Sequence, residues 1–158
     1  NRGFWEESMK IEFQRCSRYD NISSLVLLDI DKFKEVNDEH GHQVGDDVLR
    51  ELSKIITDSL RTTDNAGRYG GEEFGIILPD TSGAEALVFT ERLRQKVEAC
   101  TVLSDNKEIK FTISVGISEI SPLVSNHVQW LKQSDVALYH CKDNGRNQCA
   151  VYHSDMKL

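Results

Sequence analysis

The chain has 158 residues, of which 39% are hydrophobic, 28% are charged and two are proline. These values are ordinary for one soluble globular domain and exclude collagen-like, mucin-like and disordered chains. No apolar run approaches the roughly 18 residues that a membrane span needs, and no basic-then-apolar leader opens the chain. We therefore expect a cytoplasmic domain without direct membrane insertion.

The net charge is −7, from 26 acidic and 19 basic residues. Such a surface as a whole repels nucleic acid, so a phosphate ligand requires metal ions or a local basic cluster. The cysteines show neither a CxxC pair nor metal-finger spacing, and we interpret them as reduced packing residues. They are Cys16, Cys100, Cys141 and Cys149.

Periodic hydrophobic residues predict the first elements in chain order. Helical spacing over residues 5–16 predicts a first helix that begins almost at the chain start. The continuous apolar run 24–30 is typical of a central strand covered on both faces. A long amphipathic helix is expected over 44–56, with Asp46 and Asp47 in its first turn.

A glycine pair, Gly70-Gly71, lies between two strand-like runs and predicts a hairpin, because both central positions can take φ > 0. The second run covers Glu73 to Leu78. The remaining segments predict a helix over 86–100, a small hairpin within 101–108, a strand over 110–118, a helix over 131–141 with Gly145 as a left-handed cap, and a strand over 148–152.

This order of elements contains the split βαβ pattern of ferredoxin-like folds. We predict an α+β fold with a βαββαβ core, an added N-terminal helix, and a C-terminal helix and strand, all in one domain over residues 1–158. If the third strand inserts between the first two, the Gly70-Gly71 turn lies beside the carboxyl end of the first strand. Asp29 and the pair Glu72-Glu73 would then meet across neighbouring strands.

Two acidic pairs at this edge of the sheet, Asp29 with Asp31 and Glu72 with Glu73, predict a cation site. Two carboxylates about 4 Å apart repel by ~4 kcal/mol at an effective dielectric near 20. Oxygen ligands without His or Cys favour magnesium or manganese over zinc. The alternative is that these are strand-end carboxylates that point to solvent.

The segment 31–34 (DKFK) predicts a turn that leaves a strand and opens a short helix, where unpaired backbone N–H groups face an anion. Lys34 would add a point charge, and Lys142 and Arg146 could add two more from near the end of the last helix. Cations at a helix C-terminus are also favourable for dipole reasons alone.

Asn37 and Asp46 flank the expected loop 38–45. A carboxylate can accept two parallel N–H bonds from the Watson–Crick edge of guanine, whereas adenine offers a mismatched pattern. Asp46 could equally be an acid placed at a helix start. His40 and His42 have no third ligand at metal-site spacing, so we assign them to loop structure.

The segment 68–74 (RYGGEEF) resembles the signature of GGDEF domains, the diguanylate cyclases, in the GGEEF form that active members use. Further blocks resemble the family in the same order: 28–34 (LDIDKFK), 37–38 (ND), 41–42 (GH), 45–46 (GD), 112–116 (TISVG) and 145–147 (GRN). The resemblance covers nearly the whole chain. It implies the palm-like fold that nucleotidyl cyclases share with polymerases.

The resemblance implies that two GTP molecules are joined into cyclic di-GMP with release of two pyrophosphates, each 3′-hydroxyl attacking the α-phosphate of the other nucleotide. It implies magnesium or manganese, two ions per GTP. The general base stays open between Glu72, Glu73 and a metal-bound hydroxide. By the resemblance, metal is held by Asp29, the Ile30 carbonyl and Glu72, and the catalytic set is completed by Glu73 and Lys34. Guanine is read by Asn37 and Asp46, and the phosphates are held by Lys34, Lys142 and Arg146. The GTP site is also lined by Phe33, Gly70 and Gly71.

One chain presents one GTP site, so turnover requires a second chain facing it with two-fold symmetry. The working enzyme is therefore expected to be a homodimer. The RxxD motif from Arg61 to Asp64 lies where the family binds its product as an inhibitor. Arg92 matches a position that contributes a second arginine to that site in some members.

The chain departs from the family at its start, because the DxLT turn before the first helix is absent and Asn1-Arg2 comes first. We expect an excised output domain, the cytosolic part of a larger membrane-bound or soluble sensor protein. Three alternatives stay open: a catalytically silent GTP or cyclic di-GMP sensor, an RNA-recognition module, and an adenine-using cyclase. The last of these depends on Asp46.

Overall fold

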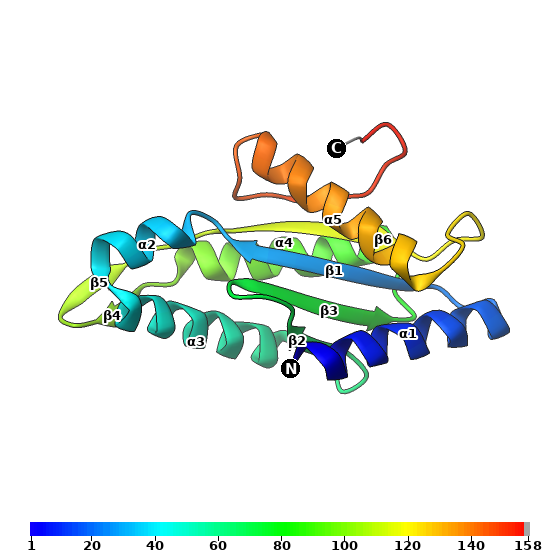
Figure 1. The fold of residues 1–158 in the computed structure, drawn as a ribbon, viewed down its shortest axis with the longest axis horizontal. Coiled ribbons are helices and arrows are strands. Elements are labelled where there is room, and N and C mark those ends of the chain that lie inside the picture. The colour runs from blue at the N-terminus through cyan, green and yellow to red at the C-terminus, as the bar shows by residue number, and fades with distance from the viewer. Residues whose placement is uncertain (157–158) are drawn as a thin grey trace.

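A central five-stranded sheet with helices on both faces forms the body of the computed structural model, which describes residues 1–156 (Figure 1). The helices are α1 (Arg2–Tyr19), α2 (Phe33–His40), α3 (His42–Ser59), α4 (Gly83–Ala99) and α5 (His127–Asp143). The strands are β1 (Ser23–Ile30), β2 (Asn65–Arg68), β3 (Glu73–Pro79), β4 (Val102–Ser104), β5 (Lys107–Ile109), β6 (Ile113–Glu119) and β7 (Cys149–Val151).

The strand order β2-β3-β1-β6-β7 confirms the ferredoxin-like core. The third strand, β3, lies between β1 and β2 as predicted, and both β3 and β6 are antiparallel to β1. Strand β7 extends the sheet in parallel with β6. The small hairpin expected within 101–108 is present as β4 and β5, apart from the main sheet.

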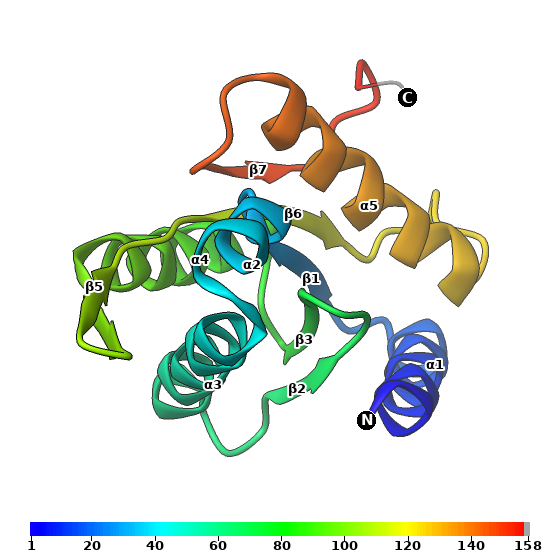
Figure 2. The same cartoon turned by 60° about the vertical axis from the view of Figure 1, so that its left-hand side comes forward.

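The two faces of the sheet bury different sets of residues. Helices α3 and α4 cover one face, and α1 and α5 cover the other (Figure 2). Val26 and Leu28 of β1 join the cluster under α3 and α4, whereas Leu25 and Leu27 join the cluster around Trp5. Every residue of β1 is buried, which confirms a central strand covered on both sides.

The connection between α2 and α3 is much shorter than predicted. The expected loop 38–45 is wrong, because α2 continues to His40 and α3 begins at His42. Gly41, with φ of 93°, lets the chain change direction within one residue. Asp46 therefore lies in the second turn of α3 rather than in its first turn, and the two histidines belong to helix ends.

The β2–β3 hairpin forms as predicted, but the reason given for its glycines is wrong. Gly41 and Gly145 are the glycines with positive φ among residues 1–156, and neither Gly70 nor Gly71 is one of them. The four-residue connection 69–72 closes instead through the N–H groups of Tyr69 and Gly70, which donate to the Glu73 carbonyl at 2.8 and 3.2 Å. Gly145, with φ of 109°, confirms the predicted left-handed cap after α5.

Helix α1 packs tightly against this hairpin through Trp5, which is fully buried. A Cβ built on Gly75 would lie 2.2 Å from the indole, and one built on Gly67 would lie 2.8 Å from the Trp5 Cβ. The Arg2 guanidinium stacks over the Tyr69 ring at 4.4 Å from its centroid. The first turn of α1 therefore contacts the segment that leads into Gly70-Gly71.

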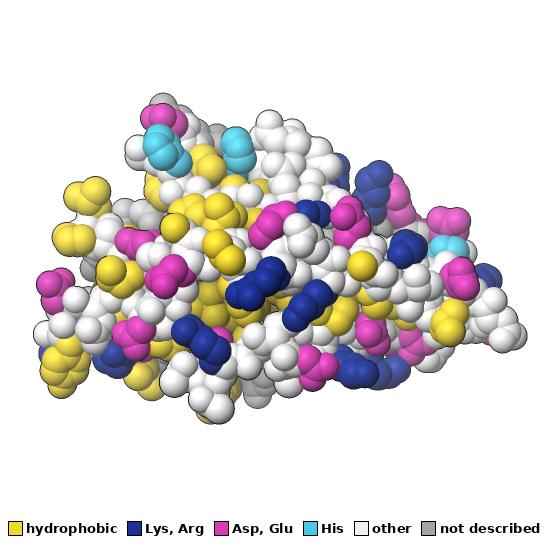
Figure 3. Space-filling model, turned by 180° about the vertical axis from the view of Figure 1, so that it is seen from behind, with side chains coloured by type: hydrophobic (Ala, Val, Ile, Leu, Met, Phe, Trp, Pro, Cys, Tyr) yellow, Lys and Arg dark blue, Asp and Glu magenta, His cyan; other side chains and the backbone are white. Residues whose placement is uncertain are grey.

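All four cysteines are free, as predicted. Burial raises the pKa of the Cys141 thiol to about 11 and that of Cys149 to about 12, so neither is a nucleophilic thiolate at neutral pH. In the described part of the chain, no helix has the length and apolar character required to cross a bilayer. Acidic and basic side chains are mixed over the face opposite to that of Figure 1 (Figure 3).

Candidate functional site

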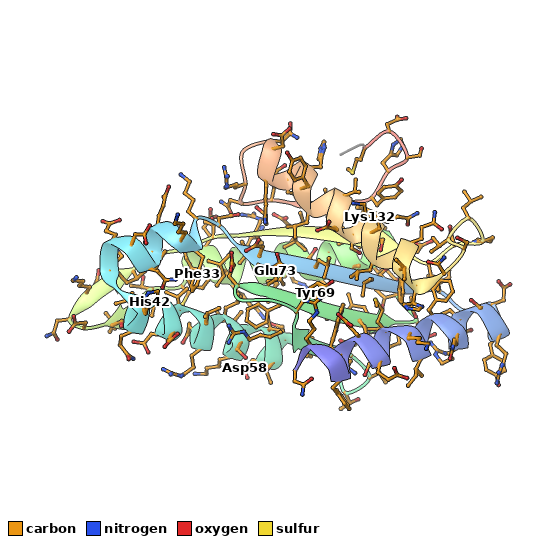
Figure 4. All side chains as sticks on the ribbon, viewed as in Figure 1. Phe33, His42, Asp58, Tyr69, Glu73 and Lys132 are labelled. Carbon is orange, nitrogen blue, oxygen red and sulfur yellow. The ribbon has the colours of Figure 1, made fainter. Side chains whose placement is uncertain are left out.

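Asp29 lies at the carboxyl end of β1 beside the turn that carries the glycine pair. It is directly opposite Glu73 in the antiparallel register, and the Ile30 N–H donates to the Glu72 carbonyl at 3.3 Å. Glu73 and Phe33 are found at the end of the sheet where α2 begins (Figure 4). The predicted meeting of Asp29 with the glutamate pair across neighbouring strands is confirmed.

The Asp29 carboxylate is buried, and only one of its two oxygens has a hydrogen-bond partner among the described residues. The residue is 4% exposed, Lys142 donates to its Oδ2, and its Oδ1 has no hydrogen-bond partner among residues 1–156. Burial raises the pKa of Asp29 to about 6, against the opposing effect of Lys142 and with a smaller contribution from the repulsion of Glu72 and Glu73. A buried unpaired carboxylate oxygen is costly, so this atom is available for a cation.

The oxygen donors at this edge fit a hard divalent cation. Within residues 1–156 no group of three His, Cys, Asp or Glu side chains is arranged to hold a metal ion. The expected ligand set has two carboxylates, on Asp29 and Glu72, and one carbonyl, on Ile30. The unpartnered Asp29 Oδ1 supports this set, because Mg²⁺ and Mn²⁺ bind through one or two carboxylates and keep other positions for water and phosphate.

Asp31 does not belong to the acidic cluster, contrary to the sequence prediction. The Ser114 hydroxyl donates to its Oδ1 at 2.6 Å, and the Thr112 hydroxyl donates to its Oδ2 at 2.7 Å. The backbone N–H of Asn147 also donates to Oδ2, at 2.9 Å. Because these donors occupy both carboxylate oxygens, Asp31 has no need of a cation.

The start of α2, where the sequence predicts an anion site, has no side-chain cap. Its N-cap, Lys32, has φ of 55° and caps no backbone N–H with its side chain. The first-turn N–H groups are therefore free of a side-chain acceptor, and the exposed Lys34 adds a positive charge in the same turn. Phe33 packs against the hydrophobic core and anchors this turn.

Asn37 of α2 packs closely against Gly45 of α3, the residue before Asp46. A Cβ built on Gly45 would lie 1.8 Å from Asn37 Oδ1 and 3.3 Å from the Phe33 ring, so only glycine allows α2 to approach α3 this closely. Asn37 is half-buried and Asp46 is exposed on the adjacent residue. Asn37 therefore contacts the residue that precedes Asp46, and Asp46 itself lines a separate cavity of about 520 Å³ along α3 with Arg50 and Arg68.

The two cations near the end of α5 have different surroundings. Lys142 is paired with Asp29 rather than free, which the sequence did not predict. Arg146 is exposed in a turn whose residues Gly145, Arg146 and Asn147 all have positive φ. It lines a cavity of about 540 Å³ together with Asp31 and Lys32, beside the start of α2.

The three residues of the expected inhibitory site line one cavity of about 250 Å³ at another part of the surface. Arg61 bonds to Asp64 at 3.1 Å and to the Thr81 hydroxyl at 2.8 Å. The Asp64 side chain is 1% exposed, whereas 58% of the Arg61 side chain is accessible. Arg92 lies across this cavity on α4, so the RxxD motif and the second arginine are brought together.

Sequence reasoning missed the hydroxyl groups that hold Asp31. Thr112 and Ser114 are two residues apart, so they project from the same face of the sheet. Two hydroxyl residues at alternating positions, one just before β6 and one buried within it, are a signal that could have pointed to a buried polar partner. Sequence reasoning also missed that the backbone of Asn147, far along the chain, contacts the same carboxylate.

Comparisons with known proteins agree with this geometry. The family model described as "Diguanylate cyclase, GGDEF domain" matches residues 1–148. The chain is 36% identical over 151 residues to the probable diguanylate cyclase DgcC of Escherichia coli, covering 96% of this chain and 40% of that protein. It is 41% identical over 133 residues to diguanylate cyclase A of Treponema denticola, covering 84% of this chain and 36% of that protein. The chain thus spans less than half the length of these relatives.

Solved structures show the same fold. The GGDEF domain of DgcB from Caulobacter crescentus, in complex with c-di-GMP, matches with a TM-score of 0.93 and 30% identity over 98% of this chain and 89% of that one. The active GGEEF domain of a diguanylate cyclase from Vibrio cholerae matches with a TM-score of 0.91 and 32% identity, covering 98% of each chain. The chain belongs to the GGDEF family of diguanylate cyclase domains.

Proposed function

We propose that this domain condenses two GTP molecules into cyclic di-GMP and releases two pyrophosphates. One observation carries the proposal: the buried Asp29 Oδ1 has no partner within the described chain, beside a glycine turn and a helix start that is open to an anion. A carboxylate that faces a cation and N–H groups that face an anion suit a metal-bound triphosphate. Relatives described as a probable diguanylate cyclase and a diguanylate cyclase, at 36% and 41% identity, support the same reaction.

Each half of the reaction forms one P–O bond and breaks another. The 3′-oxygen of one GTP attacks the α-phosphorus of the second GTP, and the bond from that phosphorus to the bridging oxygen of pyrophosphate breaks. The 3′-hydroxyl proton passes to a base, and the second half repeats the step with the nucleotides exchanged. Bound divalent cations would neutralise the triphosphate and lower the pKa of the attacking hydroxyl.

The chain's own residues position the substrate for this in-line displacement. Asp29, the Ile30 carbonyl and Glu72 would hold the cations, and Glu73 lies opposite Asp29 in the same site. Lys34 and the N–H groups of the first turn of α2 would orient the phosphates. Asp46 would accept hydrogen bonds from the guanine N–H groups, and Asn37, whose amide both donates and accepts, would bind the same base.

The glycine turn provides room for the triphosphate. Apart from Gly71 and its two chain neighbours, no residue of the described protein has an atom within 4 Å of a Cβ built on Gly71, and its φ does not require glycine. Neither packing nor backbone conformation therefore explains glycine at this position. Close approach of a ligand to the backbone does explain it.

Two such sites must face each other, because both nucleotides react with one another. We therefore propose a homodimer with two-fold symmetry as the working form of the enzyme. We also propose that cyclic di-GMP inhibits the enzyme by binding to the cavity of Arg61, Asp64 and Arg92. Arginine suits this role because its planar guanidinium binds both phosphate and the guanine edge.

The test is incubation of the nucleotide-free protein with GTP and Mg²⁺, followed by chromatography of the nucleotides. Wild-type protein should yield cyclic di-GMP, and the Glu72→Ala variant should yield none. A parallel incubation with ATP tests for an adenine-using cyclase, which would turn over ATP in place of GTP. If the wild-type protein binds GTP but makes neither linear nor cyclic dinucleotide, the cyclase proposal fails and a silent sensor is the correct interpretation.

A further inference from the structure

Asp31 holds a segment that is distant in the sequence. Its Oδ2 accepts the backbone N–H of Asn147 at 2.9 Å, although 116 residues separate the two along the chain. The same carboxylate is fixed by the hydroxyls of Thr112, just before β6, and Ser114, within it. Asp31 is 8% exposed and Ser114 is fully buried, so these hydrogen bonds are shielded from water.

The segment that Asp31 holds has a strained backbone. Arg146 and Asn147 have φ of 63° and 48°, and both follow Gly145 with φ of 109°. Left-handed conformations of residues other than glycine cost free energy and persist only where surrounding contacts enforce them. The Arg146 N–H donates to the Cys141 carbonyl at 2.9 Å, which fixes the start of the turn to the end of α5.

The side chain of Asn147 fixes the other end of the turn. Its Oδ1 accepts from Arg94 at 2.9 Å, and its Nδ2 donates to Glu98, both on α4. The Arg146 guanidinium makes no hydrogen bond to any residue within 1–156. The turn therefore presents one unpaired cation beside Lys32, in the cavity at the start of α2.

We infer that Asp31 is a positioning residue that acts through Arg146. Its carboxylate holds the Gly145–Asn147 turn in the conformation that directs the Arg146 guanidinium toward the phosphates of bound nucleotide. The inference rests on the proposed function, because it needs phosphate at the start of α2. It assigns to the second aspartate of the DID sequence a role different from that of Asp29, which faces the cation.

The experiment measures binding of two ligands that differ only in their phosphates. These are guanosine and its α,β-methylene triphosphate with Mg²⁺, which cannot be turned over at the α-phosphate. Asp31→Ala should weaken binding of the triphosphate roughly tenfold, as expected for loss of one charge-assisted hydrogen bond, and leave guanosine binding unchanged. Asp31→Asn keeps an acceptor oxygen and should show a smaller loss in the same direction.

Ser114→Ala is the matched control. It removes a donor to the other oxygen of Asp31 and leaves the bond to Asn147 in place. It should lower the thermal stability without changing the affinity for the triphosphate. Hydrogen exchange of the Asn147 amide should become faster in Asp31→Ala and stay slow in Ser114→Ala.

The double variant Asp31→Ala/Arg146→Ala separates this inference from the proposed function. If Asp31 acts through Arg146, the double variant should bind the triphosphate as weakly as Arg146→Ala alone. Additive losses, or an equal loss for guanosine, would overturn the inference and leave the cyclase proposal intact. If Asp31→Ala does not fold, an unchanged triphosphate affinity in Asp31→Asn would overturn it. Wild-type protein that binds both ligands equally would overturn the phosphate site itself.

Discussion

The ammonium group of Lys142 donates to one carboxylate oxygen of Asp29, and the other oxygen is buried without a partner within residues 1–156. The resemblance assigns this lysine to phosphate and this aspartate to metal. Under these proposed roles, Lys142 would link the two binding events, because a cation at Asp29 would compete with Lys142 for the same carboxylate. Release of Lys142 toward phosphate would accompany binding of the metal-bound nucleotide.

Asp29→Asn should abolish cyclic di-GMP synthesis without destabilising the ligand-free protein. The substitution removes a buried charge with one unsatisfied oxygen, and Lys142 can turn to solvent because its side chain is 34% exposed. We expect a free energy of unfolding that is unchanged or higher by about 1 kcal/mol. Urea denaturation without nucleotide measures it, and a clear loss of stability would contradict this interpretation.

Lys142→Met should have the opposite effect on stability. It leaves the Asp29 carboxylate buried without a counter-ion, which we expect to cost about 1–2 kcal/mol after allowance for partial solvent screening. Added Mg²⁺ should restore part of this loss in Lys142→Met and should leave the stability of Asp29→Asn unchanged. Thermal denaturation with and without Mg²⁺ checks the contrast, and an equal response of both variants would contradict it.

Gly71→Ala should lower the activity and leave the stability nearly unchanged. The methyl group has open space around it and the backbone is not in a left-handed conformation, so the free energy of unfolding should change by less than about 0.5 kcal/mol. GTP turnover should fall at least tenfold or so, because the methyl group enters the path of the triphosphate. Turnover at the wild-type rate would show that this turn does not approach the substrate.

Gly75→Ala, on the same hairpin, is the structural counterpart of Gly71→Ala. Its Cβ would lie 2.2 Å from Trp5, so α1 or β3 must move. We expect a loss of roughly 1–3 kcal/mol in the free energy of unfolding. Chemical denaturation of the two variants in parallel shows whether the glycines of this hairpin serve different purposes.

Glu12 should make the stability of the fold depend on pH. Burial by itself raises the pKa of Glu12, but hydrogen bonds from Arg15 and Ser23 outweigh it and hold the pKa below its usual range. A lowered pKa in the folded state means that the carboxylate stabilises the protein at neutral pH. This contribution is lost as the pH falls below the unfolded value of about 4.5 and through the lower folded pKa.

Glu12→Gln tests this dependence. At pH 7 the variant should be less stable than the wild-type protein by about 1–3 kcal/mol, because a buried hydrogen-bonded ion pair is broken. The difference should shrink as the pH is lowered through the acid range. Urea denaturation of both proteins at several pH values measures it, and a difference that is constant with pH would refute the assignment to Glu12.

Arg92→Ala should weaken product inhibition. Arg92 is exposed and makes no hydrogen bond within the described residues, whereas Arg61 also bonds to Thr81 and Asp64. Replacement of Arg92 therefore tests the role of this cavity in product inhibition with little effect on the stability of the fold. We expect the concentration of cyclic di-GMP for half-inhibition to rise roughly tenfold. An unchanged inhibition curve would remove Arg92 from the product site.

The sheet and the meeting of Asp29 with Glu73 could be predicted from the sequence because both depend on regular patterns. A continuous apolar run indicates a buried strand, and the ferredoxin-like order fixes which strand ends are neighbours. The one-residue break at Gly41 could not be predicted in the same way. Helical periodicity continues on both sides of it, and only the positive φ of Gly41 separates the two helices.

The sequence also could not predict which groups each acidic side chain contacts. Asp29, near the end of β1, and Asp31, just after it, are two residues apart and look equivalent in the sequence. Their surroundings differ because Asp31 faces the hydroxyls at the start of β6 and a backbone N–H from beyond α5, whereas Asp29 faces Lys142. These partners come from distant parts of the chain, so no local pattern distinguishes the two carboxylates.

The contact of Trp5 with Gly67 and Gly75 ties the first helix mechanically to the hairpin that bears the glycine turn. The indole fills the space that two absent side chains leave, so α1 cannot slide or twist without displacing β2 and β3. A torque on α1 would thus be transmitted to residues 70–73 over a short and rigid path. Helix α1 and the hairpin should therefore move together, and the hairpin turn lies at the edge of the sheet that carries Asp29 and Glu73.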